Sequence, residues 1–216
     1  MADTSPYDRI TTYGKSKFNL SIRFKDESWI MKILGSILFF NPQFMSRYIT
    51  VVGSSVYFPS REWLASNRDA AARVLCHELV HVADERRVGS WLFKLSYLFP
   101  QWLALLSLSS VVIGPWGLAF LLFLAPLPAP FRAFWESRGY MMTDAVYHLA
   151  FGNFADTNWL TGQFTTSAYY FMWPFRKGIE RQIESNRTAI LDDKMQKSIP
   201  ESKEIIDAFI GNTKMS

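Results

Sequence analysis

The sequence predicts an α+β fold: a mostly helical domain with a small antiparallel sheet and an inserted hydrophobic helical hairpin. Three observations lead to this prediction. Apolar residues recur at three- and four-residue steps in the middle of the chain, short β-branched segments lie nearer the N-terminus, and one long stretch carries no charge. The chain has 216 residues, of which 49% are apolar, so we expect one domain over residues 1–216, with the hairpin inserted at 91–131.

The N-terminal part is expected to supply the sheet. Residues 1–16 are polar and rich in turn formers, and we expect a loose arm there. Residues 18–24 alternate apolar with polar side chains, which predicts a half-buried strand, and 27–40 predicts an amphipathic helix. Segments 48–52 and 55–58 are rich in β-branched and aromatic residues. Because Gly53-Ser54 between them suits a tight turn, they predict a hairpin.

The rest of the chain is expected to be helical. Asn67 is a suitable N-cap for a helix that runs to about Arg87. A second long helix is expected over 131–152, with Pro130 in its first turn and glycine at its end. Two further helices are expected over 177–191 and after Pro200.

Charge and cysteine content exclude several classes of protein. The net charge of +4 comes from Lys and Arg residues that are scattered along the chain, so we expect no nucleic-acid partner. Cys76 is the single cysteine, and therefore no intrachain disulfide can form. The first residues do not have the pattern of a cleaved targeting segment.

His77-Glu78-Leu79-Val80-His81 forms an H-E-x-x-H motif within the first long helix. Four residues make slightly more than one helical turn, so both imidazoles project from one side and can bind a single zinc ion. Glu78 lies beside them and can act as general base on a water at the metal. The motif therefore predicts a zinc site with hydrolytic chemistry.

A catalytic zinc needs a third protein ligand and an open position. We favour Glu136, because it begins the polar face of the helix that follows the insert. Asp84 and His148 are alternatives, with Asp144 on the same helix as His148. A straight helix cannot bring both Glu136 and His148 to one metal ion. Cys76 is expected to be a buried apolar residue and not a ligand.

This motif, followed after a gap by a helical glutamate, resembles the gluzincin zinc peptidases, which are members of the zincin class. The apolar hairpin between them is similar in layout to the membrane-embedded prenyl-protease and heat-shock peptidase group. The resemblance implies that His77, His81 and Glu136 bind Zn²⁺ and that Glu78 is the base. That group usually has an aspartate four residues after its third ligand, whereas this chain has Tyr140. The Tyr140 phenol is a candidate hydrogen-bond donor to the oxyanion, or alternatively a core residue.

Residues 95–131 contain no Asp, Glu, Lys or Arg, which predicts a membrane-associated segment. The arm over 91–113 is long enough to cross a hydrocarbon core of about 30 Å, whereas 116–125 is short and more typical of a buried or re-entrant segment. The alternative is a hairpin buried against protein. Basic residues flank both ends: Arg86, Arg87, Lys94 and Arg132. If the segment inserts, we therefore expect its two ends and the zinc site to face the cytoplasmic side.

The leading hypothesis is a membrane-associated, zinc-dependent metalloendopeptidase that hydrolyses peptide or protein substrates. In zincins an edge strand next to the metal binds the substrate by β-augmentation, so the resemblance implies that residues 55–58 are a candidate for that edge. The alternative is a structural or interaction protein of a membrane or virion-like assembly, with a non-catalytic zinc and a lipid bilayer or hydrophobic protein partner. A soluble lipid-binding module would explain the insert but not the motif.

Overall fold

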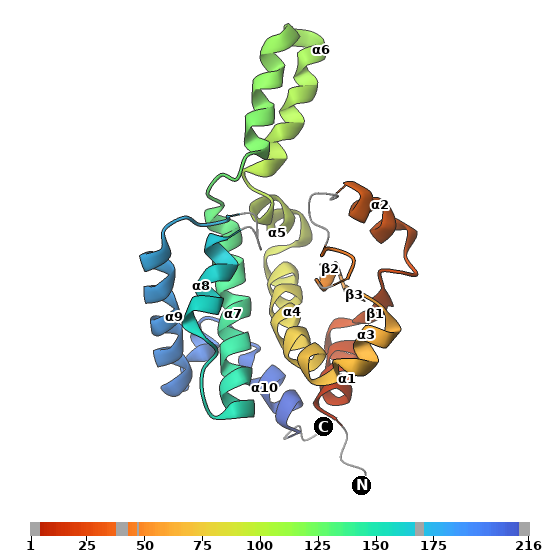
Figure 1. Ribbon diagram of the computed structural model, residues 1–216. Coiled ribbons are helices and arrows are strands. Elements are labelled where there is room, and N and C mark those ends of the chain that lie inside the picture. Colours follow the sequence, from red (N-terminus) through yellow and green to blue (C-terminus); the bar gives the residue numbers. More distant parts are fainter. Residues whose placement is uncertain (1–4, 38–42, 47, 167–170, 212–216) are drawn as a thin grey trace. The chain divides into compact units, whose positions relative to one another are not determined.

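The computed structural model describes residues 5–37, 43–46, 48–166 and 171–211, and these residues are mostly helical with one three-stranded sheet (Figure 1). The predicted α+β class is confirmed. The chain divides into two compact units, one made of residues 1–83 and 200–216 and the other of 84–199. This division falls within one continuous helix, α4 (Arg68–Val88), which begins directly after Asn67, as predicted.

The first unit contains the sheet. In chain order its elements are α1 (Pro6–Phe18), β1 (Ser21–Phe24), α2 (Trp29–Ile37), β2 (Thr50–Val52), β3 (Ser55–Phe58), α3 (Arg61–Ser66), most of α4, and α10 (Ser202–Ile210). Helix α2 falls within the helix predicted over 27–40, whose end lies outside the described residues.

A loose arm was expected over residues 1–16, and the structure describes this segment from Ser5 onwards. Helix α1 occupies residues 6–16 of it, so the prediction was wrong for these residues. The Ser5 hydroxyl caps the helix by accepting from the backbone N–H of Asp8, and Pro6 occupies the first turn. Helix α1 packs against α10, where the Arg9 guanidinium donates to the carbonyl of Phe209. A polar segment is therefore held as a helix by a partner far away in the sequence.

The sheet has the strand order β1-β3-β2 and is mixed. Strands β2 and β3 form the predicted antiparallel hairpin, with Gly53 at a φ of +59° in the turn. Strands β1 and β3 pair in parallel, so the prediction of an antiparallel sheet was wrong for this pair. The reason is that the chain between them contains both α2 and β2. Strand β2 runs opposite to β3, and the tight turn at Gly53 then reverses the chain into the direction of β1.

Strand β3 lies in the centre of the sheet, with β1 on one side and β2 on the other. Both of its hydrogen-bonding edges are therefore paired. The prediction that residues 55–58 form a free, substrate-binding edge was wrong, because β-augmentation requires an unpaired strand.

The second unit is helical and contains the insert. Its elements after α4 are α5 (Ser90–Tyr97), η1 (Gln101–Ser109), α6 (Ser110–Ile113), η2 (Gly114–Leu124), α7 (Pro130–Phe151), α8 (Thr157–Thr165), α9 (Arg176–Leu191) and η4 (Met195–Lys197). Helix α7 starts at Pro130 and ends before Gly152, whose φ is +73°, as predicted. Side chains from α7, α8 and α9 form a buried apolar cluster that includes Tyr140, Phe164 and Ile183.

Segments η1, α6 and η2 form a hairpin whose two arms lie side by side and whose apex is at α6 (Figure 1). The expected 23-residue first arm over 91–113 is not continuous, because α5 ends at Tyr97 and η1 begins after Pro100. Proline has no backbone N–H and interrupts a helix at such a point. By length and composition alone, residues 101–124 could cross a membrane, and only 6% of the segment's most apolar window is buried inside the structure.

Candidate metal centre

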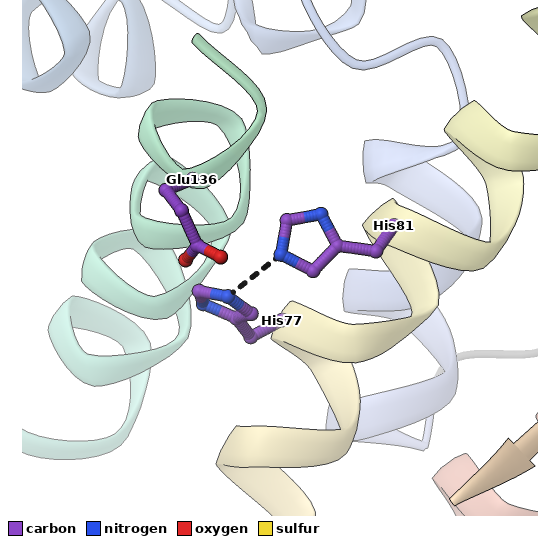
Figure 2. Close-up of side chains that lie close together, drawn as sticks. All are labelled: His77, His81 and Glu136. Carbon is purple, nitrogen blue, oxygen red and sulfur yellow. Dashed lines mark hydrogen bonds between the residues drawn. The ribbon is translucent and has the colours of Figure 1, made fainter. Parts of the chain in front are cut away.

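His77 and His81 are held by α4 one turn apart, and both side chains are buried. Their Nε2 atoms face each other at 3.0 Å (Figure 2). Two nitrogen ligands of a tetrahedral zinc ion, each about 2.0–2.1 Å from it, lie about 3.3 Å apart. The predicted histidine pair is therefore close to the geometry in which both rings bind one ion.

Glu136 is buried on α7, and its carboxylate points towards the two imidazoles (Figure 2). One ligand atom from each of His77, His81 and Glu136 lies within 4.8 Å of the other two. This brings together the three side chains that the sequence suggested as ligands. Two imidazoles and one carboxylate match the donor set of catalytic zinc sites, so the cluster could hold a metal ion.

The carboxylate of Asp84 joins the last turns of α4 to α7. The Arg138 guanidinium donates Nε to Oδ2 at 2.8 Å and Nη2 to Oδ1 at 2.7 Å, and Arg87 adds a further bond of 3.0 Å. Asp84 follows His81 by three residues, and Arg138 follows Glu136 by two. This forked ion pair therefore links α7 to the last turns of α4 within the second unit.

The alternative ligands are engaged elsewhere. Asp84 is bound by arginines, as described above, and Asp144 accepts from the backbone N–H of Ala155 and from Arg187, both at 2.8 Å. The His148 ring stacks on Phe154 at a centroid distance of 4.5 Å. Among the described residues, none of these three side chains belongs to the metal-ligand cluster.

Cys76 is fully buried next to His77 in the sequence, and burial raises the pKa of its thiol. A raised pKa disfavours the thiolate, which is the form that binds metals. The expectation that Cys76 is buried is confirmed, and Cys76 is not a member of the metal-ligand cluster found among the described residues.

The two predicted catalytic residues lie on the same helices as the ligands. Glu78 is half-buried on α4 directly after His77, and its role as general base stays a prediction. Tyr140 is buried on α7, where its ring contacts Trp159 and Phe164 and its hydroxyl donates to Gln163 Oε1 at 3.4 Å. These contacts are typical of a core tyrosine, the alternative that the sequence left open, and the oxyanion role of Tyr140 stays a prediction.

Tyr97, at the end of α5, contacts the cluster and was not identified from the sequence. Its hydroxyl donates to Glu136 Oε1, so it holds one oxygen of the candidate ligand. Arg132 donates to the Tyr97 carbonyl at 3.0 Å and to the Gln101 side chain at 2.9 Å, which ties the root of the hairpin to α7. The one signal available was that Tyr97 is the single tyrosine in the uncharged stretch 95–131.

Comparisons with models of protein families, with curated proteins and with solved structures found no match for this chain. The resemblance to gluzincins therefore rests on the H-E-x-x-H motif and the helical glutamate.

Proposed function

We propose that this protein is a zinc-dependent metalloendopeptidase in which His77, His81 and Glu136 hold the zinc ion and Glu78 is the general base. The convergence of three buried side chains with a catalytic-type donor set supports this proposal most strongly. Zinc is commonly bound by this combination of imidazole nitrogen and carboxylate oxygen, and it is redox-inactive, as hydrolysis requires no electron transfer.

When bound by such ligands, zinc supplies Lewis acidity and lowers the pKa of a water molecule towards about 7. The chain's own contribution is the proton transfer. Glu78 accepts a proton from the attacking water and returns it to the nitrogen of the leaving amine, so the carboxylate is regenerated at the end of the cycle. Glu78 is half-buried on α4 and directly follows His77, which supports this role.

The placement of the other candidate ligands favours an enzyme over the alternative of a purely structural zinc. A structural site is closed by a fourth protein ligand, whereas a catalytic site keeps one position open. Asp84 is held by two arginines and His148 stacks on Phe154. These contacts support three protein ligands with a free position for water and substrate.

We also propose that the peptidase works at a membrane, with the zinc site on the cytoplasmic side and a peptide or protein as substrate. The uncharged segment and its small buried share support membrane association. Lys94 on α5 and Arg132 on α7 flank the segment, and cytoplasmic flanks of membrane segments are enriched in such residues.

Glu78→Gln tests the proposed chemistry. We expect zinc content to stay at one ion per chain, while cleavage of a degenerate peptide library, followed by mass spectrometry, falls by about 10²- to 10⁴-fold. Glu85→Gln is the matched control, since Glu85 lies on the same helix and pairs with Lys94. Cleavage by Glu78→Gln at the wild-type rate, or no cleavage by the zinc-loaded wild type, would contradict a peptidase.

A further inference from the structure

The hairpin formed by residues 101–124 has an inverted distribution of polar and apolar side chains. Val111, Val112 and Trp116 are 89%, 86% and 81% exposed. The hairpin's serines, by contrast, are partly buried: Ser107, Ser109 and Ser110. Proteins in water place their polar side chains outside, so this surface fits an apolar surrounding.

The two arms approach each other closely at small residues. A Cβ added to Gly117 would lie 2.4 Å from the backbone nitrogen of Ser110, so only glycine fits there. Ala104 is also buried. In a bilayer the hydrophobic effect does not drive helices together, because lipid tails are as apolar as the side chains. Helices there associate through close van der Waals packing at small residues of this kind.

We propose that the hairpin inserts into a lipid bilayer from one side and turns back within the hydrocarbon core, as a re-entrant anchor. This inference deepens the membrane association proposed above and does not depend on the metal chemistry. A protein partner would cover one face of the hairpin, whereas lipid surrounds all of it. The exposed side chains of both arms are apolar, which favours lipid.

The length of the arms sets the depth of insertion. The first arm has nine residues in η1 and four in α6, and the second has eleven in η2. With a rise of about 2.0 Å per 3-10 residue and about 1.5 Å per α residue, both arms are about 22–24 Å long. Each arm is therefore longer than half of a hydrocarbon core of about 30 Å, but shorter than the whole core.

The backbone is also suited to this depth. Helical segments follow one another from Gln101 to Leu124, with the reversal at Gly114, whose φ is +69°. Helical hydrogen bonding leaves few backbone groups unpaired, which the hydrocarbon region requires. At the root, Trp91 and Lys94 are exposed on α5, and such residues are enriched at the headgroup level of a membrane.

Insertion would also place the candidate metal ligand at the membrane surface. Arg132 on α7 binds both the carbonyl of Tyr97 and the side chain of Gln101, the first residue of the hairpin. The Tyr97 hydroxyl in turn donates to Glu136. The root of the anchor is therefore connected to the metal-ligand helix by two side chains, and substrates at the bilayer surface would lie nearest to this site.

Flotation of the full-length protein with phosphatidylcholine vesicles tests the anchor. The wild type is expected to float, whereas the double variant Val111→Asp/Val112→Asp should bind vesicles at least tenfold more weakly. Leu191→Asp is the matched control, because Leu191 is an exposed leucine on α9, outside the hairpin. Equal flotation of the two variants, or a wild type that stays in solution as an oligomer, would overturn the proposal.

Labelling of Val112→Cys with a membrane-impermeant maleimide tests the depth. Native Cys76 is fully buried and serves as the internal unreactive thiol. On vesicle-bound protein, the new thiol should be at least tenfold protected from reagent outside the vesicles and from reagent trapped inside. If the new thiol reacted with the reagent trapped inside the vesicles, the hairpin would span the bilayer. That result would overturn the re-entrant depth but not the insertion. Reaction from the outside would show that the hairpin is not inserted.

The two proposals can fail separately. Zinc content and peptide cleavage are measured without vesicles, so a protein that cleaves peptides but does not float would contradict the anchor and leave the peptidase standing. A protein that floats with vesicles but does not cleave peptides would contradict the peptidase and leave the membrane anchor standing.

Discussion

Tyr97→Phe should weaken zinc binding, although Tyr97 is not itself a proposed ligand. The substitution removes a hydroxyl that donates to the buried carboxylate of Glu136 and keeps the ring, which stacks on Phe93. A hydrogen bond to a charged group contributes about 1.5–3 kcal/mol. Since about 1.4 kcal/mol corresponds to a tenfold change in affinity, the dissociation constant for zinc should rise by about 10- to 100-fold.

The affinity is measured by competition between the protein and a chromophoric chelator at fixed pH. Tyr147→Phe is the matched control, because Tyr147 lies on α7 with Glu136 and its ring contacts Phe151. We expect this control to bind zinc like the wild type. If Tyr97→Phe binds zinc within twofold of the wild type, the hydroxyl does not orient Glu136 and this reasoning is refuted.

Three further outcomes are expected. Asp84→Asn breaks the buried ion pair with Arg138 and should lower the free energy of unfolding in urea by about 3–5 kcal/mol. Burial lowers the pKa of Lys25 to about 8, against 10.5 for an unperturbed lysine. The unfolded chain therefore binds more protons between these values, and stability should rise by about 3 kcal/mol from pH 8 to 10.5 in the wild type relative to Lys25→Met. Gly117→Val should separate the arms at Ser110 and expose the hairpin to limited proteolysis.

Each of these outcomes has a control. Glu204→Gln removes an exposed ion pair with Lys17 and should cost no more than about 1 kcal/mol. If Asp84→Asn lowered the free energy of unfolding by no more than Glu204→Gln does, the buried ion pair would not hold α4 to α7. For the pH effect, a parallel stability profile of Lys25→Met would contradict the burial argument. Gly162→Ala meets only a side-chain methyl at 4.0 Å, so it should leave proteolysis unchanged.

Local patterns predicted the elements that carry the site. The i, i+4 spacing of His77 and His81 lies within one helix, and a helix fixes the relation between such residues without any help from the rest of the fold. Helix α7 could be bounded because Pro130 and Gly152 suit its two ends. Glu136 could be chosen because it begins the polar face of that helix.

The features that could not be predicted depend on contacts between distant segments. Helix α1 is polar and is stabilised through Arg9 and the carbonyl of Phe209 at the other end of the chain. The parallel pairing of β1 with β3 follows from the whole connection through α2 and β2, which neither strand encodes by itself. Tyr97 and Glu136 lie in different helices, and no spacing rule connects them. Hydrophobic periodicity reports which face of an element is buried, but not which element covers it.

Diffraction from the zinc-loaded, full-length protein at the zinc absorption edge tests the central claim most directly. One anomalous peak is expected, at about 2.0–2.2 Å from Nε2 of His77, Nε2 of His81 and one carboxylate oxygen of Glu136, with no fourth protein ligand. A peak at another place, or a carboxylate of Glu136 outside bonding distance of the metal, would contradict the account.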